Sequence, residues 1–367
     1  MKHFVGNILL SLVFLSALTQ FIHAQEKIYG KVIDGKNGEI IPYCNISVEA
    51  SLIGTVSNEL GEFIIEVDSL PIKLVFSHIS YGEKIFEISQ NSDNVVELQP
   101  FTNNLDEVTV IANKKDFYAL ELAQKAYQKA NRQSSQRKYG KGFYRQKSKN
   151  GDNYSEFSEI IYDIRYTTKG IEDWNILEGR YALKDEFVNN KNYTLLSRWL
   201  TPLQPETDEL FFPLSKNMEA YYNIRVVDVI ESDAGKIMVV WFKPTEQAPK
   251  TTFEGEVYIN ADTYDILKIT GNLEEDDLKL VRLKEKNSSW KNYKIAYEIS
   301  YKIDSTMGSI IDFIKVDHSF DYYKDDGLQY PVSSTSNLVF FEYYVPLSWK
   351  KLGGNFKKKK ERLATFG

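Results

Sequence analysis

The sequence predicts a mainly β protein in two parts: a seven-stranded Greek-key β-sandwich, then one helix followed by a curved antiparallel sheet or incomplete barrel. Three observations support this prediction. Short strand-like segments separated by turn residues fill residues 25–112. One stretch, from Asp116 to Ala130, has helical spacing. Longer segments that alternate polar and apolar residues dominate residues 113–349, and such alternation is typical of half-buried strands.

Residues 1–24 are typical of an export signal. Lys2 gives a charged start, an apolar run extends from Ile8 to Ala17, and Ala24 is a small residue just before polar sequence. A membrane anchor is the alternative, but Gln20 interrupts the run and a spanning helix needs ~20 apolar residues. We therefore expect cleavage after Ala24 and export of the mature chain.

Charge and cysteine content exclude two classes of protein. Cleavage would remove one of the 45 basic residues, leaving 44 against 51 acidic ones and a net charge of −7. A nucleic-acid-binding protein would instead show a basic face. Cys44 is the only cysteine, so no intramolecular disulfide can form, and on a predicted strand it is expected to be a small buried hydrophobe.

The segment from Lys27 to about Gln99 contains about seven short strands. In Asn45–Ala50, Ile46, Val48 and Ala50 alternate with polar residues, which places one face in a core. The other candidate strands are Ile28–Ile33, Glu62–Val67, Ile72–Ser77, Lys84–Ile88 and Asn94–Leu98. The turn residues between them are Gly35, Asn37-Gly38, Asn58, Gly61 and Tyr81-Gly82. Short strands at this spacing predict a Greek-key sandwich.

An ordered series of segments resembles the carboxypeptidase-regulatory-like domain over roughly residues 27–112. The segments are Gly30–Asp34, Ile41–Val48, Gly54–Phe63, Phe76–Gly82 and the exit segment Leu105–Val110. The family often has Asp before its glycine turn, where this chain has Asn58. The resemblance implies a transthyretin-like fold without catalysis. It also implies a module found at the N-terminus of exported Bacteroidetes proteins, including TonB-dependent receptors.

The second part begins with one predicted helix. Asp116 is a candidate N-cap, and Leu120, Ala123, Tyr127 and Ala130 recur at three- and four-residue spacing. This apolar face predicts a helix that docks on a core. A membrane-surface helix is the alternative, and the acidic residues that dilute its basic face argue against it.

Long strands follow the helix. In Tyr293–Asp304, Tyr and Ile alternate with polar residues throughout. The other candidates are Ile224–Ile230, Ile237–Phe242, Glu256–Ile259, Ile266–Thr270, Ile310–Phe320 and Ser336–Tyr344. Asn260–Asp265 is expected to be a hairpin loop. One helix before a run of antiparallel strands predicts a curved sheet with the helix against it.

Two weaker resemblances fall in this second part. Phe253–Ile269 is similar to the hairpin of LolA-like envelope carrier folds, with a glycine-led strand, a turn containing Thr and an Ile-rich return strand. The region from Ala123–Ala126 to Phe143–Arg145 resembles an uncharacterised Bacteroidetes family found behind the same sandwich. Both resemblances imply an envelope protein.

No catalytic, cofactor or metal site is predicted. The mature chain has two histidines, His78 and His318, in different predicted domains, and no His-Glu-x-x-His, Gly-x-Ser-x-Gly or phosphate-binding loop occurs. His318 is expected to be a satisfied core or face residue of its strand, with a catalytic role as the less favoured alternative. The acidic clusters Glu274–Asp277 and Asp325-Asp326 fall in predicted turns, where such runs are usually solvated, and a calcium site at the first is the less favoured alternative.

Aromatic residues and a basic tail are the candidate binding features. Aromatic residues make up 14% of the chain, and the candidates for ligand contact are Tyr322, Tyr323, Phe341, Tyr343 and Tyr344. The alternative is that β-sheets simply favour aromatic residues. Residues 350–367 carry a net charge of +6 and include Gly353-Gly354, which predicts a flexible tail. The tail is either solvated or in peripheral contact with an anionic membrane surface.

These features predict an exported, periplasmic or outer-membrane-associated protein without catalytic activity. Its expected partners are an envelope protein, a glycan or a lipid, and not nucleic acid. The sandwich would be an interaction module, and the curved sheet would present a concave aromatic surface. The alternatives are a carboxylate-dependent hydrolase of envelope glycans, or a structural spacer whose concave face is filled by its own side chains.

Overall fold

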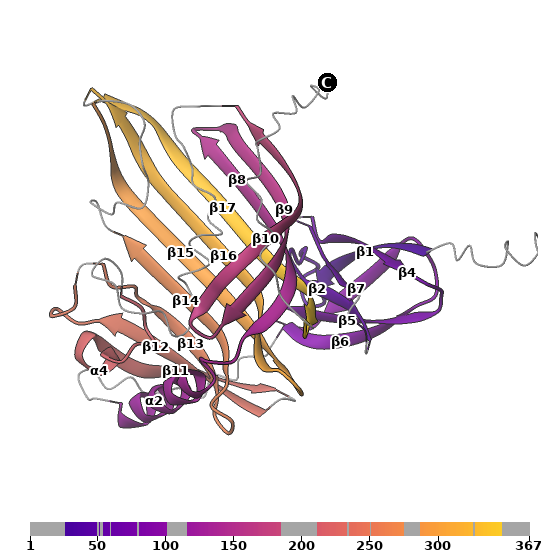
Figure 1. Cartoon of the computed structure of the whole chain (residues 1–367), viewed down its shortest axis with the longest axis horizontal. Helices are drawn as coiled ribbons and strands as arrows, with labels where there is room; N and C mark the ends of the chain where they lie inside the picture. Colours follow the sequence, from indigo (N-terminus) through magenta and orange to yellow (C-terminus); the bar gives the residue numbers. More distant parts are fainter. Residues whose placement is uncertain are drawn as a thin grey trace, which may run out of the picture. The chain divides into compact units, whose positions relative to one another are not determined.

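The computed structural model describes residues 26–49, 51, 54–58, 60–78, 81–100, 116–184, 211–232, 235–249, 251–274, 287–325 and 327–346. The predicted export signal, the exit segment 105–110 and the basic tail lie outside these residues. The chain divides into two compact units, one of residues 1–78 and 83–99 and one of residues 79–82 and 100–367 (Figure 1). Each unit is described by itself.

The first unit contains seven strands in two sheets, which confirms the predicted sandwich. The strands are β1 Glu26–Asp34, β2 Asn45–Val48, β3 Gly54–Val56, β4 Glu62–Val67, β5 Ile72–His78, β6 Tyr81–Ile88 and β7 Asn94–Leu98. One sheet has the order β4-β1-β7 and the other β3-β2-β5-β6. The first and last strands, β1 and β7, pair in parallel, so the two ends of the sandwich are joined in one sheet.

The core of the sandwich lies between these sheets. Ile28 and Val32 of β1 are fully buried, and the rings of Phe63 and Phe76, one from each sheet, meet edge to face at 5.5 Å. Burying each such side chain contributes about 1.5–3 kcal/mol. Cys44 is buried as predicted.

The glycine turn explains why Asn58 serves where the family often has Asp. Its side-chain oxygen accepts hydrogen bonds from the backbone N–H groups of Leu60, at 2.8 Å, and Glu62, at 2.9 Å. The turn needs a hydrogen-bond acceptor at this position, and an uncharged amide oxygen provides it as well as a carboxylate does. Gly61 follows with a φ of 72°, and a Cβ there would lie 2.7 Å from the carbonyl oxygen of Val32.

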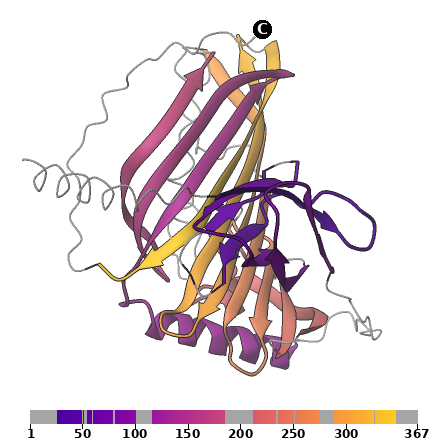
Figure 2. The same cartoon turned by 90° about the vertical axis from the view of Figure 1, so that its right-hand side faces the viewer.

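The second unit contains one long helix and a ten-stranded antiparallel sheet. The elements are α2 Phe117–Arg132, β8 Lys138–Asn150, β9 Asn153–Thr167, β10 Gly170–Leu183, α4 Met218–Tyr221, β11 Tyr222–Ser232, β12 Gly235–Pro244, β13 Gly255–Asn260, β14 Ile266–Glu274, β15 Ser288–Asp304, β16 Gly308–Lys324 and β17 Gly327–Tyr344. The strand order is β10-β9-β8-β17-β16-β15-β14-β13-β12-β11. The sheet is strongly curved, and its end strands β10 and β11 do not pair with each other, so it is an open sheet (Figure 2).

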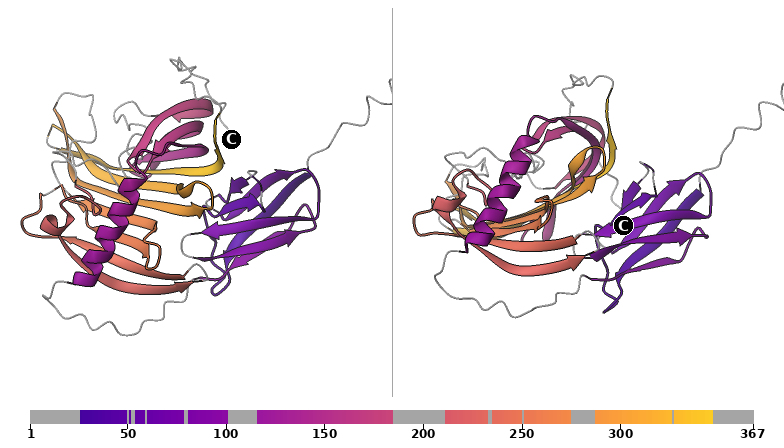
Figure 3. Two further views of the ribbon diagram at one scale, coloured as in Figure 1. Left: turned by 60° about the horizontal axis from the view of Figure 1, so that its bottom comes forward. Right: turned by 90° about the horizontal axis from the view of Figure 1, so that it is seen from below.

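Helix α2 packs against this sheet, as predicted, and it lies on the concave side (Figure 3). Asp116 is its N-cap: one carboxylate oxygen accepts from the Ala119 N–H at 3.0 Å. The other oxygen accepts from the Val226 N–H of β11 at 3.1 Å. The capping side chain therefore also fixes the start of the helix to the edge of the sheet.

The buried face of α2 differs from the predicted one. Its buried residues are Ala119, Leu122, Ala123, Ala126 and Ala130. The predicted Leu120 and Tyr127 are only partly buried at its margin. The small alanines let the helix backbone approach the sheet closely, and a pattern search weighted toward large side chains underrates such a face.

The alternation in β15 is confirmed, with Tyr293, Ile295, Tyr297, Ile299 and Tyr301 all buried. Ile303, which the same pattern places inside, is exposed near the end of the strand.

Three strands, β8, β9 and β10, were not predicted. In β8 the inward positions include Gly140, Gly142, Gln146 and Ser148, so the strand lacks an apolar face. Its period of two is visible only in its burial, which alternates along the whole strand. The sheet is therefore larger than the sequence indicates.

Candidate functional site

The inner face of the ten-stranded sheet is a packed core in the described residues. Among its largest side chains, Tyr144, Tyr162, Tyr166, Tyr293, Phe320 and Phe340 are fully buried. Tyr293 and Phe320 stack with their rings almost parallel, 5.8 Å apart. The described aromatic side chains on this concave face thus contact one another.

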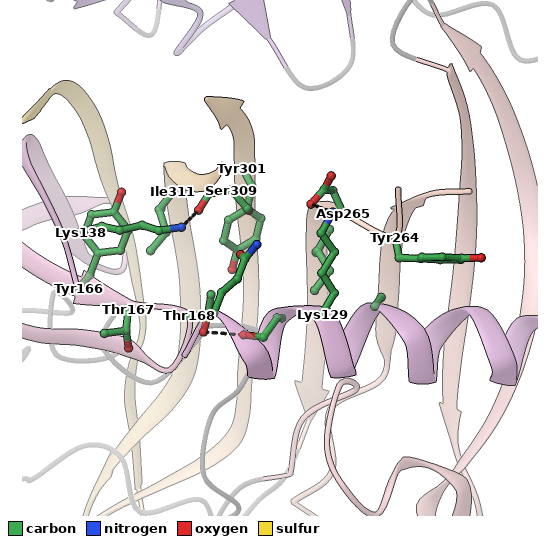
Figure 4. A pocket seen from close by; sticks show the side chains of 14 residues that line it. Lys129, Lys138, Tyr166, Thr167, Thr168, Tyr264, Asp265, Tyr301, Ser309 and Ile311 are labelled. Carbon is green, nitrogen blue, oxygen red and sulfur yellow. Dashed lines mark hydrogen bonds and ion pairs between the residues drawn. The ribbon is translucent and has the colours of Figure 1, made fainter. Parts of the chain in front are cut away.

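A cavity of about 20 Å³ lies where α2 meets the sheet (Figure 4). The Lys138 amine donates to the Ser309 carbonyl, and burial lowers the pKa of Lys138. Lys129 forms an ion pair with Asp265 at 2.6 Å. The space holds about one water molecule, which is too little for a substrate. The Lys129–Asp265 ion pair joins helix α2 to the β13–β14 loop, and the Lys138 contact joins β8 to β16.

A chain of polar side chains crosses the inner face away from the helix. The Tyr144 hydroxyl donates to Gln146 at 2.6 Å, the Gln146 amide donates to Ser148 at 3.3 Å, and the Ser148 and Ser334 hydroxyls lie 2.8 Å apart. These groups are buried, and each is satisfied by the next. No periodic signal predicts these hydrogen-bonded side chains, because serine and glutamine at inward positions resemble a solvated face.

His318 lies on the same inner face. It is 3% exposed, and its Nδ1 lies 3.2 Å from the Tyr293 hydroxyl. Burial lowers the pKa of His318 to about 3. The prediction that His318 is a core residue is confirmed.

The structure does not bring the five aromatic binding candidates together. Tyr322 and Tyr323 lie near the β16–β17 turn, where they pair with Tyr330 and Leu328 of β17. Phe341, Tyr343 and Tyr344 lie at the other end of β17. The candidates therefore form two groups, one on β16 beside the start of β17 and the other at the end of β17.

Individually, two of the five candidates are core residues. Tyr322 is buried, and Tyr343 is buried with its hydroxyl donating to the Ile311 carbonyl at 2.6 Å. Tyr323 lies under the Lys291 amine, Phe341 occupies a β-bulge, and Tyr344 donates to Asp163. Their role in ligand binding stays a prediction.

A groove of about 880 Å³ lies on the outer face, the side of the sheet away from α2. Its floor comes from side chains that alternate with buried inner residues, such as Glu298 between Tyr297 and Ile299. The lining residues from five strands include Trp241 (β12), Glu256 (β13), Thr270, Asn272 and Glu274 (β14), Ala296 and Glu298 (β15), and Lys315 and Asp317 (β16). The loop after β12 adds Pro244, Thr245, Ala248, Pro249, Thr252 and Glu254. We call this surface the outer groove.

The outer groove is acidic and its charges are organised. Five carboxylates and one lysine line it. Glu298 pairs with Lys268 at 3.1 Å, and Asp317 pairs with Lys315 at 3.0 Å. Tyr258 donates to Glu256 at 3.2 Å, and burial together with that carboxylate raises the pKa of Tyr258.

Trp241 is the more exposed of the two aromatic residues that line the outer groove, since Tyr297 is buried. It is partly buried, and the Lys243 amine lies 5.4 Å from the centre of its ring. Neutral hydrogen-bonding groups, those of Thr270 and Asn272, lie on the neighbouring floor. The groove thus combines the Trp241 ring with hydrogen-bond acceptors and donors, an arrangement suited to a polar ligand.

The described residues contain no group of three or more His, Cys, Asp or Glu side chains that could hold a metal ion. Among them, no helix combines the length and the apolar character that crossing a bilayer requires. Of the predicted acidic clusters, Glu274 forms an ion pair with Lys294 at 2.9 Å, while residues 275–277 and 326 lie outside the described residues.

Two solved structures show a distant likeness. A domain from Vibrio parahaemolyticus, described as an outer membrane lipoprotein-sorting protein, is 11% identical, with 64% of this chain and 94% of that domain covered and a TM-score of 0.28. A DUF1329 family protein from Desulfovibrio piger is 9% identical, with 64% and 94% covered and a TM-score of 0.27. At these TM-scores neither likeness carries an argument about function.

The first unit has a clear family match. A TonB-dependent receptor of Formosa agariphila is 30% identical over 100 residues, which are 27% of this chain and 10% of the receptor. The chain thus spans a tenth of that relative. Residues 28–110 match the CarboxypepD_reg-like domain family, close to the predicted limits of 27 and 112. The first unit of this chain is a CarboxypepD_reg-like domain.

Proposed function

We propose that this chain is a non-enzymatic envelope protein that binds a glycan in the outer groove. The observation that carries the proposal is the groove itself, a hollow of about 880 Å³ built from the outer faces of five strands. Ligand sites typically enclose ~300–1,000 Å³. The size therefore suits an oligosaccharide segment.

The chemistry of the lining favours a sugar over a lipid. Glu256, Asn272 and Glu298 offer oxygen acceptors to hydroxyl groups, and Trp241 offers a flat apolar ring to a sugar face. An acyl chain would require a mainly apolar lining. The aromatic side chains of the concave face are already packed against one another in the described core. The five carboxylates further favour a neutral or cationic glycan over an anionic one.

Two alternatives explain the groove less well. A glycoside hydrolase needs two carboxyl groups that face each other across the cleft, free to act as acid and as base or nucleophile. Glu274, Glu298 and Asp317 are instead held in ion pairs with lysines. The other two carboxylates, Glu254 and Glu256, lie two residues apart along one extended segment, which places them on the same face and not across the groove from each other. A structural spacer agrees with the packed inner face but gives no reason for a large polar hollow on the outer one.

The first unit and the location complete the proposal. The CarboxypepD_reg-like domain would act as the interaction module for an envelope protein, since the matched family is a non-catalytic domain. The export signal at residues 1–24 would deliver the chain to the periplasm or the outer membrane, and the basic tail would contact an anionic membrane surface.

The test is a binding measurement with three hexasaccharides of different charge. By isothermal titration calorimetry, we expect the mature chain to bind cellohexaose or a glucosamine hexamer and to bind a galacturonate hexamer far more weakly. Trp241→Ala should weaken binding by tenfold or more, since a buried aromatic contact is worth about 1–2 kcal/mol. Tyr154→Ala, which removes an exposed ring outside the groove, should leave binding unchanged.

Two results would contradict the proposal. One is the absence of heat with every neutral and cationic oligosaccharide tested. The other is equal affinity of the wild-type chain and a folded Trp241→Ala variant, which would move the ligand to another surface.

A further inference from the structure

Strand β10 is one edge of the ten-stranded sheet and presents an unusually exposed run. Within the described residues it pairs with β9 alone. Five consecutive residues, Leu177–Tyr181, are exposed, and Leu183 is exposed beyond them. The exposed fractions of Leu177, Tyr181 and Leu183 are 44%, 41% and 40%. An exposed edge strand with apolar side chains is a template for pairing with another strand.

The opposite edge of the same sheet is treated differently. The Val226 N–H of β11 donates to the Asp116 carboxylate, and helix α2 packs along that strand. A covering helix is one of the means by which proteins prevent edge pairing. β10 has no such helix over it among the described elements, and its β-bulge between Ile176 and Glu178 lies to one side of the Glu178–Arg180 segment. Over that segment the two edges therefore differ in their capacity to accept a further strand.

The exposed run of β10 is complementary to itself. If two copies pair antiparallel about Gly179, Glu178 lies opposite the partner subunit's Arg180, and Arg180 lies opposite the partner's Glu178. Leu177, at the β-bulge between Ile176 and Glu178, lies just beyond these two charged pairs. Opposite charges and apolar side chains in directly facing positions stabilise an antiparallel pair, whereas like charges there destabilise it.

We propose that β10 is a docking edge for a second copy of this chain, joining two ten-stranded sheets in one continuous sheet around a two-fold axis at Gly179. A two-fold interface requires a surface that is complementary to itself, and this segment of β10 meets that requirement.

The faces of the sheet agree with this register. Arg180 lies opposite Glu159 and Glu178 opposite Ile161, so both side chains point to the outer face. Directly opposed residues of an antiparallel ladder share a face, and the pairing of Glu178 with the partner's Arg180 obeys this rule. Arg180 also bonds Glu159 within its own sheet, so it would lie between two carboxylates, one from each copy.

Charge reversal tests the edge. By sedimentation velocity from about 1 to 100 µM, where mass action drives a weak dimer, we expect the mature wild-type chain to shift from monomer to dimer. Glu178→Arg places two like-charged pairs in the interface and should raise the dimer dissociation constant by about tenfold or more. Glu178 forms no ion pair in the described structure, so its replacement leaves the described ion pairs of the monomer intact.

A rescue variant and a control sharpen the result. Glu178→Arg combined with Arg180→Glu exchanges the charges and should restore the dimer. Asp152→Arg, which makes the same charge reversal in the β8–β9 turn, should dimerise like the wild type. The proposal is overturned by a wild-type chain that stays monomeric, or by a Glu178→Arg variant that dimerises as well as the wild type. A folded double variant that stays monomeric overturns the register about Gly179.

Discussion

The inner face of the sheet places a titratable side chain in a fully enclosed position. His318 lies beside the stacked rings of Tyr293 and Phe320, edge to face with both, and its ring centre is 5.9 Å from each of theirs. Burial lowers its pKa from the ordinary value of 6.5 to about 3. The unfolded chain therefore binds a proton at this position in a pH range where the folded chain does not.

This difference predicts a loss of stability on mild acidification. Because the folded pKa lies below the unfolded one, stability is present above about pH 6.5 and falls as the pH drops toward 3. Between about pH 7 and pH 5 the loss from this residue is about 2 kcal/mol. Urea unfolding at the two pH values should show it, and His318→Asn, which keeps a polar partner for Tyr293, should show a smaller loss. An equal loss in the variant would contradict the assignment.

At the scale of the element, helix α2 depends on one carboxylate with two tasks. Asp116 caps the helix through the Ala119 N–H and holds β11 through the Val226 N–H. Asp116→Ala should destabilise the second unit by about 1–3 kcal/mol, because it removes a cap and leaves a second donor without its acceptor.

A second variant separates the two tasks of Asp116. Asp116→Ser retains a cap for Ala119 but is too short to reach both donors, so its unfolding free energy should lie between those of the wild type and Asp116→Ala. Chemical denaturation of the mature chain measures all three. Wild-type stability in Asp116→Ala would show that neither hydrogen bond matters.

The elements differ in how far the sequence predicted them. Where inward residues are large and apolar, as in Tyr293–Tyr301 of β15, the period of two predicted the strand and its buried face. In β8 the inward residues Gly142, Gln146 and Ser148 carry no such signal, and the strand went unpredicted. The helix was predicted with its N-cap, but alanines at its buried face shifted that face away from Leu120 and Tyr127.

The outer groove was not predictable for a further reason. Its residues extend from Trp241 to Asp317, and each strand contributes only a few of them. They meet because five antiparallel strands adopt one register, which is a property of the sheet and not of any short motif. The aromatic clusters that composition singled out, such as Tyr322 and Tyr343, went largely into the core because buried sheet positions favour aromatic side chains.

At the scale of the whole molecule, we expect different surfaces to have different tasks. The inner face of the large sheet packs against α2 and stabilises the second unit, and its outer face carries the outer groove. The edge strand β10 offers pairing to a second copy, and the CarboxypepD_reg-like domain forms a separate compact unit. A stable sheet with a rigid outer face suits a protein that holds a ligand without transforming it.

Hydrogen–deuterium exchange shows directly whether the outer groove binds the ligand. With a saturating oligosaccharide that binds the mature chain, we expect slower amide exchange in residues 244–256 and in β14–β16, which line the groove. The sandwich strands and the β8–β10 segment should exchange as in the free chain. Protection confined to the sandwich or to β8–β10, with none in the groove segments, would show that the outer groove is not the binding site.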